Sequence, residues 1–389
     1  MRRGCEVHVV CVNPSTVPRL HWDQELANLY PNLIHYHFVS FPNSPTNIWQ
    51  KLRNIGSQIP DPYRRWAHQA ESVALDLAKQ IQFDLLLTFA SPMSDHLTGL
   101  GLKKHLRCPW VAHFSDPWVD NPYNAYMNTI LSRYVSARQE RSVIAQADSA
   151  VFVSSETQDL VMRKYPNTWR TKTWVIPHYF DPDIYPKVNP LDVHSKMIFR
   201  HIGRFYQHRT PEPLFQALYQ LKSEKPVVLE GVVFEMIGPS PPYLLHRLRA
   251  KYDLQDCVTI RSSVPYLESL KLMAESDVLM VMDAPVTDPN VFLPSKLVDY
   301  LGTGRPLMGI TPLRGPSADL IRKSKGLVAD PRNLSGIVDV IAAYIGEYRM
   351  DGLVRRKPGK AIMQAYKVDT VSEHFQELFL QLVEEDDRN

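Results

Sequence analysis

The feature that most constrains the fold of this chain is a repeated alternation between short apolar runs and amphipathic segments. Runs such as Trp110–Phe114 and Val278–Met282 are bounded by turn residues and are too short for buried helices, which is typical of strands covered on both faces. Helical patterns, such as residues 128–147, lie between the runs. The order strand, helix, strand, helix predicts parallel sheets covered by helices.

The alternation occurs in two series, separated by a segment rich in proline and aspartate at residues 177–186. Strands are expected in the first series at 6–12, 33–41, 84–90, 110–114, 150–153 and 172–176, and in the second at 198–202, 234–237, 258–260, 278–282, 307–310 and 327–329. A chain of 389 residues is also too long for one ordinary core. We therefore predict an α/β protein with two doubly wound, Rossmann-like domains that face a cleft.

The predicted domains span residues 1–183 and 184–365, and residues 366–389 form a final helical segment. This helix has an apolar face formed by Phe375, Leu378, Phe379 and Leu382. Burying that face requires a groove, which the first domain can offer. The start of the chain is unusual, because residues 1–4 read as the end of a helix that leads into the first strand. A doubly wound domain normally opens with a strand before that helix. We expect a first domain that lacks its first strand, through N-terminal truncation or through a reordered topology.

Composition and charge exclude several classes of protein. The net charge of +3 is too small to predict a nucleic-acid partner. The four cysteines are scattered, which argues against a disulfide framework or a zinc site and fits a reducing cytoplasm. No apolar run approaches the roughly 20 residues that span a bilayer. Basic residues at 64–65 and 103–107 leave open a peripheral contact with the inner face of a membrane, and a monomer and a dimer both remain open.

The segment from Asp288 to Pro306 is the strongest candidate for a binding site. It follows the expected strand 278–282, and open α/β sheets bind ligands at the carboxyl ends of their strands. Ser295 and Lys296 stand at a helix start, where free backbone N–H groups favour an anion. Asp299 follows one turn later, at a spacing that reaches a ribose hydroxyl. A structural interpretation remains open, with Ser295 as an N-cap and the two charges solvated.

A second loop, residues 201–213, follows the first strand of the second series. Gly203 permits a tight turn, and Arg204 and Arg209 bring two permanent cations whose planar groups suit a diphosphate. The alternative is that these arginines are solvated or pair with acids such as Glu212. Turns that follow the next two strands, at Gly238 and Ser263, can face the same cleft, although turns after strands commonly look like this.

In the first series Asp116 directly follows a strand and is the best candidate for a catalytic or acceptor-orienting acid. Its alternative role is to cap the turn before Pro117. His96 lies on a helix face and can serve the reaction or only pack. The chain has no G-x-S-x-G motif, no metal-ligand cluster and no Walker loop, which weakens hydrolase, metalloenzyme and kinase interpretations.

These motifs, in this order, resemble the retaining, family-4-like glycosyltransferases of the GT-B fold, and in particular bacterial enzymes that act on cell-surface or secondary sugars. The resemblance covers nearly the whole chain and rests on residues 3–10, 88–96, 114–118, 175–182, 203–213 and 293–306. The last two segments are the most specific. The sequence departs from the family pattern at Val291, which replaces the first of two acids, and at Asp299, which replaces the second with a shorter one. Asp283 or Asp288 can substitute for the first acid.

The resemblance implies transfer of a sugar from a UDP- or GDP-linked donor to a glycan, lipid-linked or small-molecule acceptor, with retention at the anomeric carbon and with no metal or other cofactor. It implies a donor site formed by Gly203, Arg204, Arg209, Gly238, Ser263, Pro294, Ser295, Lys296 and Asp299. The cations Arg204, Arg209 and Lys296 would stabilise the departing diphosphate. Asp116 and His96 would face the sugar or the acceptor.

Two other functions stay open at this stage. A sugar-nucleotide 2-epimerase uses the same fold, but it needs acids and histidines in the second domain that the sequence does not group together. A binding or partner subunit that no longer catalyses is the other alternative, and Val291 and the missing strand favour it.

Overall fold

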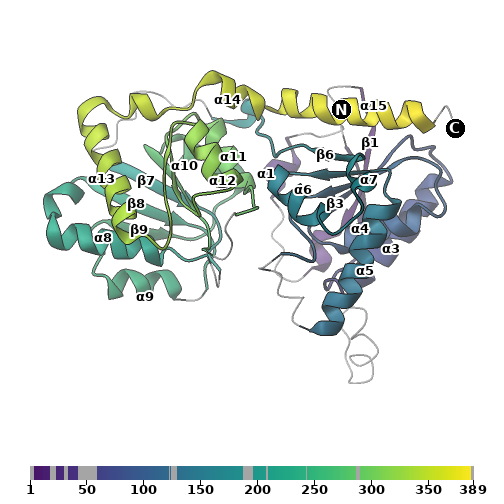
Figure 1. The fold of residues 1–389 in the computed structure, drawn as a ribbon, viewed down its shortest axis with the longest axis horizontal. Helices are drawn as coiled ribbons and strands as arrows, with labels where there is room; N and C mark the ends of the chain where they lie inside the picture. The colour runs from purple at the N-terminus through teal and green to yellow at the C-terminus, as the bar shows by residue number, and fades with distance from the viewer. Residues whose placement is uncertain are drawn as a thin grey trace. The chain divides into compact units, whose positions relative to one another are not determined.

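The computed structural model describes residues 4–17, 23–29, 34–42, 59–121, 123, 129–186, 196–206, 209–241, 243–285 and 290–386. Asp288 therefore lies outside the described residues. The chain forms two compact units, the first made of Met1–Ile176 with Glu373–Asn389 and the second of Pro177–Ser372 (Figure 1).

The second unit is built on one parallel sheet of six strands. Its strands are β7 (Met197–Ile202), β8 (Val232–Ile237), β9 (Val258–Arg261), β10 (Val278–Met282), β11 (Leu307–Ile310) and β12 (Leu327–Ala329). Their order in the sheet is β12-β11-β10-β7-β8-β9, so the first strand lies in the interior and the chain winds outward from it in both directions. This is the doubly wound arrangement that the sequence predicts.

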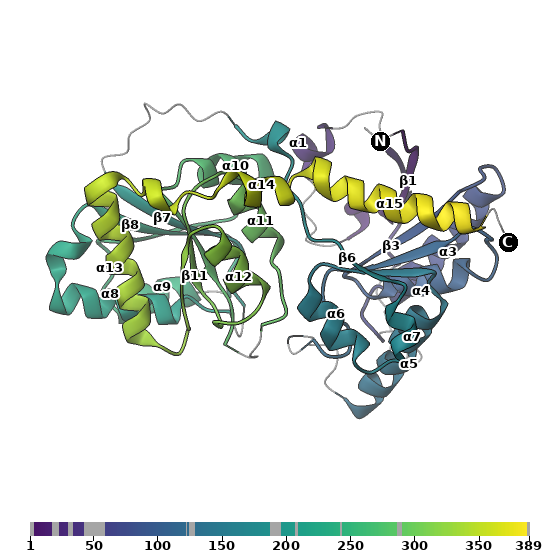
Figure 2. The same ribbon diagram turned by 45° about the horizontal axis from the view of Figure 1, so that its top comes forward.

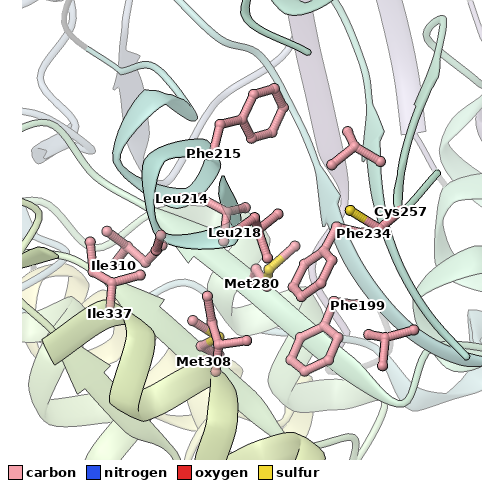
Figure 3. Packing of buried hydrophobic residues seen from close by; sticks show 14 of the residues in the cluster. Phe199, Leu214, Phe215, Leu218, Phe234, Cys257, Met280, Met308, Ile310 and Ile337 are labelled. Atoms are coloured by element: carbon pink, nitrogen blue, oxygen red, sulfur yellow. The ribbon is translucent and has the colours of Figure 1, made fainter. Parts of the chain in front are cut away.

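Alternating side chains of these strands meet different helices. Phe199 of β7 and Met308 of β11 face a core shared with α8 (Glu212–Glu224), α9 (Leu244–Lys251) and α13 (Leu334–Asp351) (Figure 3). The neighbouring residues face the opposite way: Arg200 donates to the carbonyl of Leu272 in α10 (Tyr266–Ala274). Gly309 lies against Ile321 of α12 (Pro316–Lys323). Because successive side chains of a strand point to opposite faces, these contacts show that helices cover both faces of the sheet.

The described strands of the first unit form two parallel sheets. β1 (Val7–Val12) pairs with β2 (Ile34–Val39), and a second sheet has the order β3 (Leu86–Ala90), β4 (Trp110–Phe114), β5 (Ser149–Phe152), β6 (Thr173–Val175). The helices of this unit are α1 (Gln24–Ala27), α3 (Arg64–Ala78), α4 (Ser94–Leu102), α5 (Ile130–Gln146), α6 (Ser155–Met162) and α7 (Asn167–Arg170). α4, α5, α6 and α7 lie on one side of the four-stranded sheet (Figure 2).

The C-terminal helix α15 (Val368–Asp386) contributes its residues from Glu373 onward to the first unit. Its Phe375 ring lies 6.1 Å from the ring of His113 in β4, and Leu378 and Leu382 are buried. The remaining described elements are α11 (Ser295–Gly302), α14 (Lys360–Ala365) and the short turns η1 (Pro14–Thr16), η4 (Pro182–Ile184), η5 (Pro226–Leu229) and η6 (Val354–Arg356). No helix in the described ranges has the length and apolar character needed to cross a bilayer. None of the four cysteines is in a disulfide.

A pair of glycine substitutions tests the packing. Gly99→Ala in α4 is expected to lower the free energy of unfolding, because a Cβ at this position would overlap the fully buried ring of Trp110. Overpacking of this kind costs about 1–3 kcal/mol. Gly346→Ala in α13 is the matched control, because no atom outside the nearby backbone of its own helix lies within 4 Å of its Cβ position. That change is expected to stabilise by about 0.5–1 kcal/mol, since alanine loses less conformational freedom than glycine. Scanning calorimetry of the full chain measures both, and shifts of the same sign would contradict this packing.

Candidate functional site

The candidate site lies in the second unit where the winding of the sheet reverses direction. β7 and β10 are neighbours in the sheet, although β8 and β9 separate them in the sequence. From β7 the chain proceeds to one edge of the sheet, and from β10 to the other. Loops that leave two such strands diverge, and the crevice outside their carboxyl ends is where open α/β sheets bind ligands. The loop after β7 and the helix α11 after β10 carry the predicted donor residues.

Two glycines let the backbone approach a cation at this point. Gly203 follows β7 with φ +149°, and any side chain here would overlap the amine of Lys296 in α11. Gly238 follows β8 with φ +130°, and a Cβ there would lie 2.5 Å from the carbonyl oxygen of Gly203. The structure therefore brings Gly203, Gly238 and Lys296 together, as the sequence predicts. The role of the two glycines is to leave room for the Lys296 ammonium and for the loop, because they have no side chain that could contact a ligand.

His201, the penultimate residue of β7, orients this ammonium. Its Nδ1 lies 2.9 Å from the carbonyl oxygen of Met280, so Nδ1 carries the proton and donates it. The other ring nitrogen, Nε2, is then an acceptor, and it lies 3.4 Å from Nζ of Lys296. Burial, and next the Lys296 charge, hold the pKa of His201 well below its usual value. His201 is therefore neutral, and its Nε2 orients the amine of Lys296 by facing it as an acceptor.

Lys296 is a cation in an unfavourable place when no anion is bound. Burial and, next, the charge of Arg209 lower its pKa from 10.5 to about 7, although Asp283 partly opposes the shift. A lysine poised near neutrality gains its proton when a negative ligand arrives, because an opposite charge favours the ammonium. A perturbed lysine among other charged groups at a ligand crevice is typical of a functional site.

Arg209 is held beside Lys296 by a buried carboxylate. Its Nη2 donates to Oδ1 of Asp283 over 3.1 Å, and its guanidinium lies 5.1 Å from the centre of the Tyr206 ring. The other oxygen of Asp283 accepts from Asn290 at 3.2 Å and from Thr311 at 2.9 Å. Asp283 is thus engaged in positioning Arg209. The Nε of Arg209 is buried and has no partner among the described residues.

The start of α11 offers backbone donors beside these cations. Pro294 is the N-cap residue, and no side chain caps the helix. Ser295 is exposed and follows the cap, so the N-cap role considered for it is not seen. The positive end of the helix dipole therefore has no side-chain acceptor among the described residues. Such a helix start favours an anionic group.

Asp299 lies one turn further along α11 and is held by two tyrosines of other segments. Tyr266, at the start of α10, donates its hydroxyl hydrogen bond to Oδ1 over 3.0 Å, and Tyr185 donates to the Asp299 carbonyl over 3.0 Å. Burial raises the pKa of Asp299 to about 6, against the Tyr266 hydrogen bond that lowers it. No described residue donates a hydrogen bond to its second carboxylate oxygen, which can accept from a ligand hydroxyl. Tyr266 is a residue that the sequence analysis missed.

A buried tyrosine fixes α11 against β7. The Tyr300 hydroxyl accepts from the N–H of Ile202 over 2.7 Å and lies 3.0 Å from the Ile202 carbonyl oxygen. The side chain is completely buried. Because Ile202 precedes Gly203, this contact sets the distance between the loop after β7 and Lys296. No sequence signal singles out Tyr300 beyond its place on the apolar face of the helix.

The other predicted residues of this unit are placed as follows. Arg204 is exposed directly after Gly203 and makes no hydrogen bond or ion pair with a described residue, so its guanidinium is available. Ser263 is exposed in the turn between β9 and α10. Val291, at the position where the family has an acid, is buried at 6% exposure and supplies no charge.

The predicted residues of the first unit, Asp116 and His96, lie at the carboxyl end of β4 and in α4. Asp116 is partly exposed in the loop after β4. His96 is completely buried, with Nδ1 2.8 Å from the Thr88 hydroxyl oxygen. Burial lowers its pKa to about 3, so it is neutral. In this structure His96 packs in the core, which is the structural alternative raised for it. The roles of both residues toward an acceptor stay predictions.

The arrangement of the strands is that of a known fold. Solved structures that match along most of the chain include glycosyltransferases of the GT-B type. Sucrose-phosphate synthase from Thermosynechococcus elongatus is 15% identical with a TM-score of 0.66, covering 97% of this chain and 99% of that one. WaaG, a glycosyltransferase involved in lipopolysaccharide biosynthesis, is 13% identical with a TM-score of 0.61, covering 97% and 92%. An α,α-trehalose-phosphate synthase (UDP-forming) from Burkholderia xenovorans is 12% identical with a TM-score of 0.61, covering 82% and 77%.

Residues 1–184 match the family model of Glycosyltransferase Family 4, and no curated protein matches the sequence. Residues 1–184 are therefore similar to this family, and the chain as a whole has the GT-B fold. This confirms the family-level resemblance that the sequence motifs indicate.

Removing the Tyr300 hydroxyl tests its positioning role. Tyr300→Phe leaves the buried N–H of Ile202 without its acceptor, and such a loss costs about 1–3 kcal/mol of stability. Tyr344→Phe is the matched control, because the Tyr344 hydroxyl accepts from Leu327 N–H over 3.0 Å and lies 2.5 Å from the Leu307 carbonyl oxygen, and neither partner belongs to α11. Calorimetric unfolding should show similar losses for both variants. Only Tyr300→Phe is expected to weaken binding of a nucleoside diphosphate in titration calorimetry. Equal effects on binding would contradict the positioning role.

Proposed function

We propose that this chain transfers a sugar from a nucleotide diphosphate sugar, UDP- or GDP-linked, to an acceptor with retention of the anomeric configuration and without a metal at the donor site. The observation that carries the proposal is the convergence of Lys296, Arg209 and the uncapped start of α11 at the carboxyl ends of β7 and β10. A cationic crevice with free backbone donors suits a diphosphate. The trehalose-phosphate synthase of the same fold is UDP-forming by its name.

The chemical work of this site is to stabilise a leaving group. As the bond between the sugar and the diphosphate breaks, negative charge grows on the phosphate oxygen. Lys296 and Arg209, already fixed by His201 and Asp283, face that charge without having to reorganise. Arg204 adds a third, solvent-exposed cation from the same loop. Preorganised cations of this kind supply the electrostatic stabilisation for which other enzymes use a metal ion.

The remaining donor contacts follow from α11 and the turns around it. Asp299 accepts a ribose hydroxyl through the carboxylate oxygen that Tyr266 does not occupy. The exposed turn at Ser263 offers backbone groups to the base. Asp116 faces the sugar or the acceptor, which is a glycan, a lipid-linked sugar or a small molecule. A lipid-linked acceptor would bring this cytoplasmic enzyme to the inner face of the membrane.

A screen of nucleotide diphosphate sugars tests the proposal. At least one UDP- or GDP-linked sugar is expected to raise the melting temperature of the wild type, and Arg204→Ala is expected to lose most of this shift. Arg322→Ala is the matched control, because Arg322 is an exposed arginine of α12 that pairs with Asp319 in its own helix. If no donor raises the melting temperature, or if both variants lose the shift equally, the assignment of the donor site is wrong.

Product analysis then separates transfer from its alternatives. Nuclear magnetic resonance of the product is expected to show the anomeric configuration of the donor, and inversion would contradict retention. Conversion of the donor sugar without an acceptor would indicate a 2-epimerase. Donor binding without turnover on any acceptor would indicate a binding subunit, which the apolar Val291 at the position of the family acid favours.

The pKa of Lys296 predicts the pH dependence of donor binding. Its value of about 7 in the free protein means that the ammonium is present below pH 7 and is lost as the pH rises above it. Donor affinity is therefore expected to fall above pH 7, by up to about tenfold per pH unit, as binding must recruit a proton. A nucleotide diphosphate sugar has no titrating phosphate proton in this range, so the change belongs to the protein.

Titration calorimetry in buffers of different ionisation enthalpy measures the proton uptake directly. At pH 8 the wild type is expected to take up a proton on donor binding. Lys296→Met is expected to bind weakly, with no uptake and no dependence on pH between 7 and 9. Lys271→Met, which changes a solvent-exposed lysine of α10, should behave like the wild type. Proton uptake that persists in Lys296→Met would assign the titration to another group.

A further inference from the structure

A cluster of histidines and a glutamate lies on β1 and β2 of the first unit, away from the donor residues in the sequence and in a different unit. The parallel register pairs His8 directly with His35 and Val10 with His37. Side chains two residues apart in extended backbone share a face, so Glu6, directly before β1, joins His8, and His37 joins His35 on β2. Four polar side chains therefore share one face at the beginning of this two-stranded sheet.

The distances in this cluster suit one shared metal ion once the exposed His35 ring turns out of its stack with His8, in which the ring centres are 4.6 Å apart and the ring planes differ by 19°. The Nε2 of His8 lies 3.1 Å from Oε1 of Glu6, and the Nε2 of His35 lies 3.5 Å from the same oxygen. One ligand atom from each of the three residues can be chosen so that all lie within 4.8 Å of one another. In a tetrahedral zinc site with bonds of about 2.0–2.1 Å, neighbouring ligand atoms are about 3.3 Å apart. The distances of 3.1 Å and 3.5 Å from the Glu6 oxygen to the two histidine nitrogens lie on either side of this ligand spacing.

His37 has the place of an outer partner to this set. Its Nε2 lies 3.0 Å from Nδ1 of His8, on the side of the His8 ring opposite Glu6. A metal bound at Nε2 of His8 leaves the proton on Nδ1, which then donates to His37. Such a hydrogen bond to the second ring nitrogen is the usual means by which proteins orient a metal-ligating histidine. The His8 ring is also packed, with 10% exposure and an edge contact to Phe83 at 5.4 Å.

We propose that Glu6, His8 and His35 bind one divalent transition-metal ion, with Zn²⁺ as the representative probe, and that His37 orients His8. Imidazole and carboxylate ligands suit zinc and its neighbours in the periodic table. The three protein ligands leave a further position for water. Glu6 and His35 are exposed, so the ion has access from solvent.

The site has a structural reason to exist. The described part of the first sheet is only a two-stranded parallel pair, and pairs of this kind are weak on their own. Packing of Val39 against Trp66 of α3 holds the carboxyl half of the pair. The metal would bridge β1 to β2 at the amino-terminal end of the pair, where histidines occupy the face that valines occupy in the carboxyl half. It thereby stabilises the strand pair without taking part in the transfer reaction.

Zinc titration of the full, tag-free chain after chelator treatment tests the proposal. The wild type is expected to bind one Zn²⁺ per chain and to melt at a higher temperature with it. His35→Ala and Glu6→Gln change exposed side chains and should fold normally, and each is expected to bind at least about tenfold more weakly. His37→Ala is expected to lose about 10–100-fold while one Zn²⁺ still binds, as the loss of an outer partner predicts.

The matched control is His68→Ala, which removes a 66% exposed histidine lying 3.8 Å from Glu71 in α3 of the same unit. A surface pair of this kind can bind Zn²⁺ only weakly, so removing His68 should leave the affinity of the chain for Zn²⁺ unchanged. The Co²⁺-loaded wild type is expected to show the intense visible bands of a tetrahedral site, and His35→Ala to lack them. No bound Zn²⁺ in the wild type, or binding that survives His35→Ala, would overturn the site. A loss in His68→Ala equal to that in His35→Ala would also overturn it.

Discussion

The contact between the Lys296 amine and the backbone at Gly203 is the interaction on which the candidate site depends. It requires the two glycines after β7 and β8, because a side chain at either would displace the amine or the loop. It requires a neutral His201, whose proton is fixed on Nδ1 by the carbonyl of Met280. It also requires Tyr300 to hold α11 at the right distance from β7. The ammonium is thereby kept in a place that it would not occupy for its own stability, and its attraction for an anion follows from this.

The fold could be predicted almost completely from the sequence. The strands β10, β11 and β12 occur at the expected residues, and β4 does also, because short apolar runs between turn residues have few other structures available to them. The order of helices and strands then fixes a parallel, doubly wound sheet. The described part of the expected helical region 48–82 is α3, and the earlier part lies outside the described residues. The helices α12 and α13 were not singled out by their residues, although a helix is expected after each parallel strand.

The site could be predicted only in part, for a physical reason. Gly203, Arg209 and Lys296 are recognisable because few residue types suit a tight turn or an anion, and these positions follow strands. His201, Tyr266 and Tyr300 were missed, because each acts through a partner 33 to 98 residues away in the sequence. The histidines of β1 and β2 were missed for the same reason, since His8 and His37 are 29 residues apart and meet only through strand register. Patterns along a chain indicate what a residue can do, whereas pairing across a sheet determines which residue it meets.

The close approach of Gly238 to the carbonyl of Gly203 restricts how this protein can vary. At most packed positions an enlarged side chain can be compensated by a smaller neighbour. Here both partners are already glycine, and no smaller residue exists, so neither position can rescue a change at the other. Arg204, which is exposed beside them, has no such restriction. Descendants of this sequence are therefore free to alter the strength of the cationic loop while its backbone path stays the same.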